Sequence, residues 1–212
     1  MALINFAHRE ITIKVVYFGA KGTGTAANAQ VLFDWLPAEE KSDLHALGPG
    51  EEDERATYFD YVPPGGGPLY QFSVRMQVYS MSCGVATDAL RREVMADVDT
   101  VVFVTAARKA RDQLNLEAML ELERQLRDDA QELASLPVVI QVVHTDAPDA
   151  RPTRDATFDV NPYQFPIVEV ASATGEGVVD TQEQVGELTI ERIRSSLSGK
   201  GSAISLTAVH RS

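Results

Sequence analysis

A predicted strand, a glycine-rich turn and a helix start follow one another over residues 13–27. This layout is typical of a phosphate-binding loop, in which backbone N–H groups and a helix N-terminus surround an anion. The pattern G-x-x-x-x-G-K-[ST] fixes the spacing of two glycines, and Gly19 and Gly24 have that spacing. Thr25 stands where the lysine belongs, and Ala26 stands where the Mg²⁺-binding hydroxyl belongs. The sequence therefore predicts the scaffold of a nucleotide site without its two key side chains.

The composition limits the partners and the compartment. The chain of 212 residues has 31 acidic and 19 basic residues, and its formal net charge is −12. A surface of this charge repels nucleic-acid backbones and anionic lipids, so neither is an expected partner. The one cysteine, Cys83, excludes an intramolecular disulfide, and no segment has the form of a signal peptide or a membrane span. We expect a cytoplasmic protein without membrane insertion.

Apolar runs of strand length alternate with helical patterns along most of the chain. The predicted strands cover residues 11–18, 57–62, 70–79, 100–105, 137–143 and 165–170, and the predicted helices cover residues 26–36, 111–134 and 181–197. The strands around Val102 and Ile140 are apolar on both faces, which is typical of a parallel sheet covered by helices. This alternation predicts an α/β fold: one domain over residues 1–197, followed by a mobile tail over residues 198–212.

Two strands break the alternation at one edge of the sheet. A segment rich in Pro and Gly, residues 63–68, is all that connects the strands at 57–62 and 70–79. No helix fits this connection, so the two strands are predicted to form an antiparallel hairpin. Residues 42–56 are predicted to be an exposed loop, and residues 147–163 have little helical pattern. We expect a mostly parallel sheet of six or more strands, with one antiparallel edge strand and helices on both faces.

Several motifs resemble the MglA family, the bacterial gliding-motility and polarity GTPases, which have a Ras-like P-loop GTPase fold. The resemblance spans about residues 3–196 and rests on residues 4–6 (INF), 9–11 (REI), 14–19 (KVVYFG), 54–55 (ER), 59–63 (FDYVP), 101–104 (VVFV), 137–141 (PVVIQ), 146–148 (DAP) and 174–181 (TGEGVVDT). It implies a Ras-like fold for nearly the whole chain. Fold does not decide function, so each position of the nucleotide site is compared separately.

The resemblance identifies what the phosphate loop lacks. The family carries Lys-Thr or Lys-Ser after the second glycine, where the lysine neutralises phosphate charge and the hydroxyl binds Mg²⁺. Thr25 and Ala26 can do neither, and several charge-assisted hydrogen bonds to a nucleotide are therefore lost. Lys21 lies inside the loop and offers an alternative cation, although a lysine in a glycine turn is more commonly solvated.

The first switch segment is also altered. Arg55 resembles the arginine finger of the family, which stabilises charge during hydrolysis. Ala56 occupies the place of the Mg²⁺-binding threonine, and Thr57 comes one residue late, on the opposite face of a strand. Asp60 matches an aspartate of the family and is equally typical of a solvated hairpin residue.

In the second switch segment, Cys83 replaces the glycine whose N–H meets the γ-phosphate, and Gly84 replaces the glutamine that orients water. A shifted alignment returns Gly84 to the glycine role, but no glutamine follows. Hydrolysis by the usual mechanism is therefore not expected. A reactive thiol at Cys83 is the less favoured alternative to a small loop residue, because no neighbouring cation activates it.

Base recognition in the family uses Asn-Lys-x-Asp, and here Asp146 alone is retained, since Val143 and His144 replace the first two residues. His144 either stacks on a base or is a partly exposed histidine at a strand end. The later loop with Ser172 and Ala173 retains the shape that donates backbone N–H groups in the family.

The losses fall at every nucleotide contact while the strands and helices persist. We therefore expect an MglA-like pseudo-GTPase with weak or no nucleotide binding, no cofactor, no metal and no efficient GTP hydrolysis. The resemblance implies a protein-binding module whose partner is a roadblock-type regulator or a related GTPase. The expected partner surface is switch-like and includes Arg55, Asp60, Cys83 and Gly84, and the helix at 111–134 is a second candidate.

Two other functions remain open. The first is a divergent but working switch that binds GTP or GDP with Mg²⁺ through Lys21, Thr23, Thr25 and Asp146. The second is an enzyme with a pocket around Cys83 and His144. A pseudo-GTPase should have a phosphate loop closed by its own side chains, whereas a switch must keep an open anion site.

Overall fold

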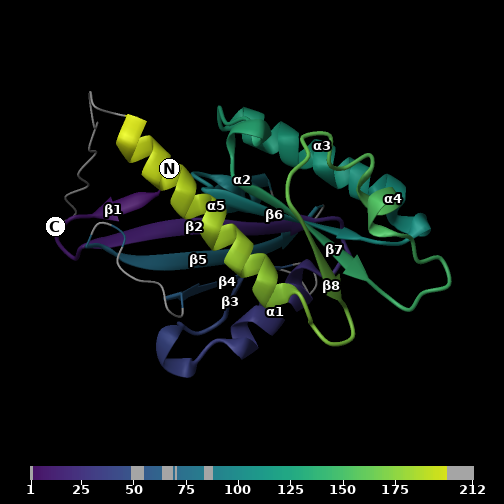
Figure 1. Ribbon diagram of the computed structural model, residues 1–212, viewed down its shortest axis with the longest axis horizontal. Helices are drawn as coiled ribbons and strands as arrows, with labels where there is room; N and C mark the ends of the chain where they lie inside the picture. The colour runs from purple at the N-terminus through teal and green to yellow at the C-terminus, as the bar shows by residue number, and fades with distance from the viewer. Residues whose placement is uncertain (1, 49–54, 64–68, 70, 84–87, 200–212) are drawn as a thin grey trace.

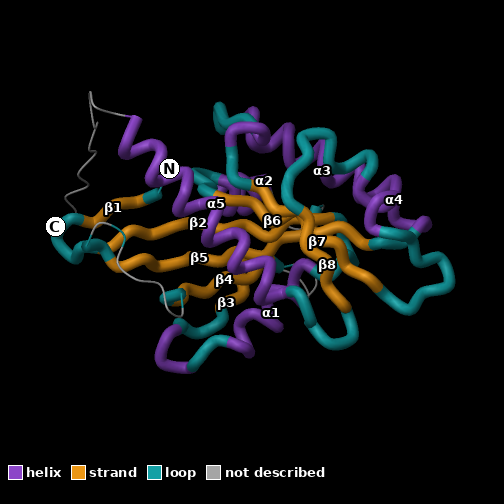
Figure 2. The backbone as a smooth tube through the Cα atoms, in the orientation of Figure 1, coloured by secondary structure: helices purple, strands orange, loops and turns teal. Residues whose placement is uncertain are grey.

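The computed structural model describes residues 2–48, 55–63, 69, 71–83 and 88–199. Its strands are β1 (Leu3–Asn5), β2 (Glu10–Gly19), β3 (His45–Leu47), β4 (Ala56–Tyr61), β5 (Ser73–Ser82), β6 (Thr100–Ala106), β7 (Val138–His144) and β8 (Ile167–Ala171). Its α-helices are α1 (Thr25–Trp35), α2 (Asp88–Met95), α3 (Asp112–Asp128), α4 (Thr153–Thr157) and α5 (Val178–Gly199). The strands form one sheet with helices on both sides (Figures 1 and 2). The predicted α/β fold is confirmed.

The sheet is built around β2. The strand order is β3-β4-β5-β2-β6-β7-β8, and β1 pairs with β2 outside this path. β2 runs parallel to both β5 and β6. Its side chains from Val15 to Phe18 are fully buried, since helices cover both faces of the sheet. An apolar run of β-branched and aromatic residues suits such a strand, which no water reaches on either side.

The antiparallel edge has one strand more than the sequence predicts. β4 and β5 pair antiparallel, which confirms the hairpin. β3 then pairs antiparallel with β4, so the prediction that residues 42–56 are all loop is wrong at β3. β3 has three residues and no fully buried side chain. This strand is held by its hydrogen bonds to β4 and has no apolar pattern of its own. The sequence therefore gives little indication of it.

Helices of different length cover the two faces. α1 and α5 pack on the face that includes Tyr17 and Val104, and α2 and α3 pack on the face that includes Phe18 and Phe103. Figure 1 shows α5 lying diagonally across the near face. α5 extends to Gly199, two residues beyond the predicted domain end.

Three helical predictions need correction. α3 ends at Asp128 rather than near residue 134, because Ala130 takes a left-handed conformation (φ 56°) and a 3₁₀ turn follows at Leu133–Ser135. α2 was not predicted, since this helix of eight residues buries only Val94 and Met95. The five-residue α4 lies within residues 147–163, where little helix was expected.

A chain of buried polar groups joins α1, β7 and α5. Asn28 Nδ2 donates to Gln141 Oε1 (2.7 Å), Gln141 Nε2 donates to Thr181 Oγ1 (2.9 Å), and Thr181 Oγ1 donates to Gly177 O (2.8 Å). The Gln141 and Thr181 residues are fully buried, so water replaces none of these bonds. The chain therefore fixes the position of α1, which follows the phosphate-type loop, relative to the centre of the sheet.

We expect Gln141→Leu to lower the free energy of unfolding by about 2–3 kcal/mol, because the Asn28 amide loses its acceptor and Thr181 loses a donor inside the core. Urea denaturation measures the loss. Gln113→Leu is the matched control: Gln113 is exposed and bonds Glu117 one turn along α3, so its loss should stay within about 0.5 kcal/mol. Equal losses in the two variants would show that the buried chain contributes nothing specific.

Candidate functional site

The candidate site lies where the parallel strands end. β2 ends at Gly19, β5 at Ser82, β6 at Ala106, β7 at His144 and β8 at Ala171. Parallel strands place their carboxyl ends at one edge of the sheet, where α/β proteins bind ligands. The fold therefore gathers the phosphate-type loop, the second switch segment and both base-recognition segments along one edge. The Cys83 N–H donates to Gly19 O (2.7 Å) and joins the first two of these segments directly.

The phosphate-type loop keeps an anion-binding backbone. Gly22 and Gly24 adopt positive φ angles of 79° and 96°, and α1 begins at Thr25. The hydrogen bond from Asn28 N to Gly24 O (2.8 Å) closes the first turn of the helix. The backbone N–H groups of the residues just before Asn28 therefore make no bond of this kind within the helix. No described side chain caps this end of α1, and no acidic residue lies in its first turn. The backbone thus retains the positive end of a helix dipole.

Two contacts brace the loop from outside and inside. Arg111, at the N-terminal end of α3, donates from Nη1 to Lys21 O (3.0 Å). Its guanidinium lies so close to Gly22 that a Cβ there would be 2.9 Å from Arg111 Nη2. Inside the loop, the Thr23 hydroxyl donates to Ala20 O (2.8 Å). No motif in the sequence indicates that Arg111 belongs to this site.

The hydroxyl of Thr25 is used within the protein. Thr25 is 2% exposed, and its Oγ1 shares a hydrogen bond with Ser82 Oγ at 2.8 Å. Residue 25, where the family resemblance leads one to expect a phosphate-binding lysine, therefore forms a neutral bond to the end of β5. Ala26, which follows, is exposed and carries no hydroxyl.

The candidate residues of the first switch segment lie in two different parts of the sheet. Ala56 is fully buried on the face covered by α2 and α3, and Thr57 follows on the opposite face of β4 by strand alternation. The β4–β5 register places Arg55 beside the Ser82 end of β5. Asp60 pairs with Gln77, about 17 Å along the strand from Arg55 at the usual rise per residue. Arg55 thus lies near Cys83 in the sheet, whereas Asp60 does not.

Cys83 is half-buried next to this edge. Burial raises the pKa of its thiol, Glu121 raises it further, and Arg91 opposes the shift. The β-sheet order separates Cys83 from His144 by three strand spacings, about 14 Å, so the two do not form a Cys–His pair. Gly84 lies outside the described residues.

The base-recognition segments are held by their own contacts. His144 is half-buried at the end of β7, and its Nε2 lies 3.0 Å from Thr153 Oγ1 on α4. Ser172 N donates to His144 O (3.0 Å), which ties the later loop to β7. The side chains of Asp146, Ser172 and Ala173 are exposed.

The later loop also contacts α1. Gly175 has a positive φ of 72°, and a Cβ at this position would lie 2.7 Å from Val31 Cγ1. The glycine therefore allows the loop after β8 to pack directly on α1. As a result, α1 contacts both the phosphate-type side and the base-recognition side of the site.

Among the described residues, no group of three or more His, Cys, Asp or Glu side chains is placed to hold a metal ion. No helix in the same part of the chain is long and apolar enough to cross a membrane.

We expect the Cys83 thiol to react slowly with iodoacetamide. Its raised pKa leaves less thiolate at pH 8 than free cysteine has, and the thiolate is the reacting form. The rate of alkylation is followed by mass spectrometry from pH 7 to pH 10. It should reach half of its maximum at a higher pH than the rate of alkylation of N-acetylcysteine amide does. Unfolding in urea should raise the rate to that of the small thiol. A folded-state rate at pH 8 above that of the small thiol would contradict the expectation.

The mutual gliding-motility protein MglA of Myxococcus xanthus (strain DK1622) is 31% identical over 194 residues, which cover 92% of this chain and 98% of that protein. No protein-family model matches the chain.

Proposed function

The chain belongs to the MglA family of Ras-like small GTPases, and from this premise we propose that it is a pseudo-GTPase that acts as a protein-binding module. It would bind nucleotide weakly or not at all, need neither nucleotide nor Mg²⁺ for its role, and hydrolyse no GTP efficiently. Its setting would be a cytoplasmic system that regulates bacterial polarity or motility, and the name of the Myxococcus relative refers to gliding motility.

The contact between Thr25 and Ser82 carries this proposal. A lysine at position 25 would place an ammonium group against the β- and γ-phosphates, and a hydroxyl at position 26 would bind Mg²⁺. Here residue 25 forms a neutral bond inside the protein, and residue 26 is alanine. Ala56, buried in the core, removes the second hydroxyl that Mg²⁺ would use. A nucleotide triphosphate would thus bring its charge to a site with few groups to neutralise it.

Two observations favour the working-switch alternative. The N-terminus of α1 is uncapped, and the Arg111 guanidinium lies on the phosphate-type loop, so the loop retains positive potential. These groups support weak attraction of an anion. They supply no ligand for Mg²⁺ and no group that orients water, and we therefore place this alternative second.

The proposed partner surface lies where Arg55 approaches the end of β5, close to Cys83. By family resemblance, the partner would be a roadblock-type regulator or a GTPase of the same family. A partner protein that binds this surface recognises its shape, and this recognition does not require GTP hydrolysis.

We expect the midpoint of thermal unfolding to stay unchanged in millimolar GTP, GDP or ATP with Mg²⁺. A nucleotide at a hundred times its Kd would stabilise the fold by about 2.7 kcal/mol and raise the midpoint by roughly 5–10 °C for a chain of this size. Scanning fluorimetry measures the midpoint. A rise that occurs with GTP and GDP but not with ATP would overturn the proposal in favour of a guanine-nucleotide switch.

We expect the double variant Thr25→Lys/Ala26→Ser to gain nucleotide affinity. The new lysine and hydroxyl restore charge-assisted contacts that are worth about 1.5–3 kcal/mol each, so affinity for GTP with Mg²⁺ should rise by at least about tenfold. Titration with a fluorescent GTP analogue compares the variant with the original chain, and Thr25→Val/Ala26→Ser is the control without the cation. If the double variant folds but its affinity for GTP does not rise, then the residues at positions 25 and 26 are not what limits nucleotide binding in this chain.

A further inference from the structure

The short helix α2 needs contacts outside itself to stay formed. It has eight residues, and a helix of this length is marginal in water without tertiary packing. Two of its side chains, Val94 and Met95, are fully buried in the core. Leu90 packs on the chain just after β3, because a Cβ on Gly48 would lie 2.6 Å from Leu90 Cδ2. These contacts anchor one face of α2, and the carbonyl groups at its C-terminal end need partners of their own.

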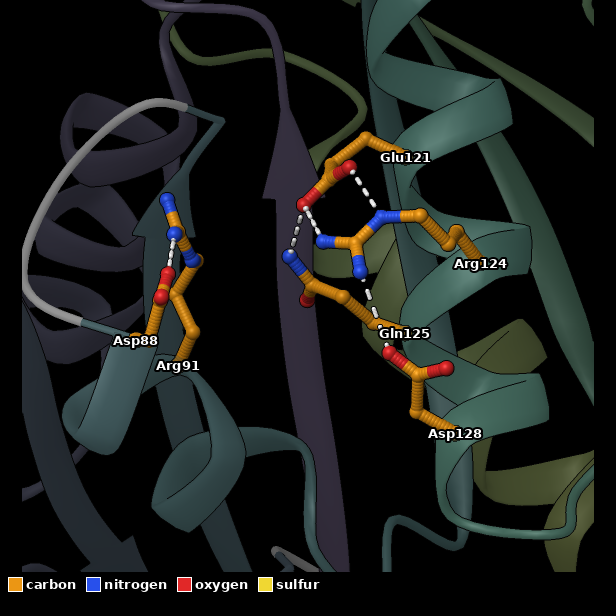
Figure 3. Close-up of polar contacts among 6 residues, drawn as sticks. All are labelled: Asp88, Arg91, Glu121, Arg124, Gln125 and Asp128. Atoms are coloured by element: carbon orange, nitrogen blue, oxygen red, sulfur yellow. Dashed lines mark hydrogen bonds and ion pairs between the residues drawn. The ribbon is translucent and has the colours of Figure 1, made fainter.

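The polar residues that face each other on α2 and α3 bond within their own helices. Figure 3 draws six of them, and each bond in it joins two residues of the same helix. Arg91 forms an ion pair with Asp88 on α2. Arg124 bonds Glu121 and Asp128 on α3. The bonds drawn there therefore do not attach α2 to its neighbour.

Lys14 of β2 attaches the end of α2 to the sheet. Its Nζ donates to Glu93 O (3.0 Å) and to Ala96 O (2.8 Å), at the C-terminal end of the helix. Carbonyl groups at this end have no partner inside a helix, and their partial negative charge favours a cation. Asp97 then takes a left-handed conformation (φ 54°), which ends the helix here. The ammonium group thus binds the last turn of α2 from outside.

The rest of Lys14 is also fixed in place. Lys14 N donates to Asp99 Oδ2 (2.9 Å), and Asp99 N donates to Lys14 O (3.0 Å). The Nζ lies 4.7 Å from the centre of the Tyr79 ring on β5, a distance at which a cation is attracted to the ring. By strand alternation, Lys14 shares the face of β2 that includes Val16 and Phe18. The lysine is therefore mounted on the central strand, directly under α2.

The surroundings of the ammonium group offset the cost of its burial. Lys14 is half-buried, and burial lowers its pKa. Asp97, Asp99, Glu93 and Asp129 act in the opposite direction, because each carboxylate favours the charged form of the lysine. A lysine without such partners extends its ammonium group into water. Lys14 instead keeps this group over the end of a helix.

We propose that Lys14 is a latch between β2 and α2. While its ammonium group holds the carbonyl groups of Glu93 and Ala96, α2 stays on the sheet. When the ammonium group leaves them, α2 opens as a unit separate from the rest of the domain, as segments with few buried side chains do. α2 is the first helix after the second switch segment, so the latch controls how this part of the chain is presented. The inference concerns the chain without a ligand and does not depend on the function proposed above.

Amide hydrogen exchange of the full chain without nucleotide tests the latch. Lys14→Met removes the ammonium group and keeps an unbranched stem. The amides of residues 92–98 should exchange roughly tenfold to a hundredfold faster in this variant, since hydrogen bonds from a charged donor are lost. Val139 and Ile140 of β7 are fully buried and report global unfolding, so the change is measured relative to them. A substitution that only lowers global stability speeds exchange in both regions by the same factor.

Lys41→Met is the matched control. Lys41 also donates to a carbonyl near a helix end, Phe33 O of α1, and its ammonium group lies 4.0 Å from the centre of the Phe33 ring. This variant should speed exchange at Leu36, whose N–H donates to Leu32 O in the last turn of α1. Residues 92–98 should exchange as they do in the original chain. Each lysine is thus expected to loosen only its own helix.

A second measurement needs no substitution, and it tests the latch even if Lys14→Met fails to fold. In NMR spectra of the ¹⁵N-labelled chain, the ammonium protons of Lys14 should exchange with water more slowly than those of Lys109, which is exposed. Protons held by two carbonyl groups are less available to water than those of a solvated ammonium group.

Three results would contradict the latch. The first is a folded Lys14→Met variant in which exchange at residues 92–98 changes no more than it does in β7. The second is a Lys41→Met variant that speeds exchange at residues 92–98 as much as Lys14→Met does. The third is equally fast exchange of the ammonium protons of Lys14 and Lys109.

Discussion

The close approach of β2 to β6 at Gly19 controls the geometry of the whole site. A Cβ on Gly19 would lie 2.3 Å from Val104 O and 2.8 Å from Thr23 Oγ1, distances that no other residue type tolerates. Glycine lets the strand end in contact with its neighbour, and the chain then turns so tightly that Thr23 bonds Ala20 O. The start of α1 follows from this turn, and Asn28 attaches the helix to the centre of the sheet.

The fold was largely predictable because its main signals are local. The strands β2, β6 and β7 contain buried runs that are mostly apolar, and the short link between β4 and β5 requires a hairpin. The elements that sequence reasoning missed, β1, β3, α2 and α4, are short and bury few side chains. Such segments are held by edge pairing and by neighbouring elements, which leave little periodicity in the sequence.

The site was predictable in part. The glycine spacing located the phosphate-type loop, and the substitutions at residues 25 and 26 were visible directly. Arg111 was not foreseen, because it reaches Lys21 across 90 residues and only the folded sheet brings the two together. Contacts of this kind depend on tertiary packing, whereas motif spacing depends on the local chain.

Two hydrogen bonds, Cys83 N to Gly19 O and Thr25 to Ser82, stitch the phosphate-type loop to the end of β5. In a switching GTPase the duration of a signal is set by hydrolysis, which works as a clock inside the domain. On the proposal made above, this domain hydrolyses no GTP efficiently and therefore has no such clock. Its surface would then be available to a partner for the lifetime of the molecule, and the strength of its signal would depend on how many copies the cell makes and how fast it removes them.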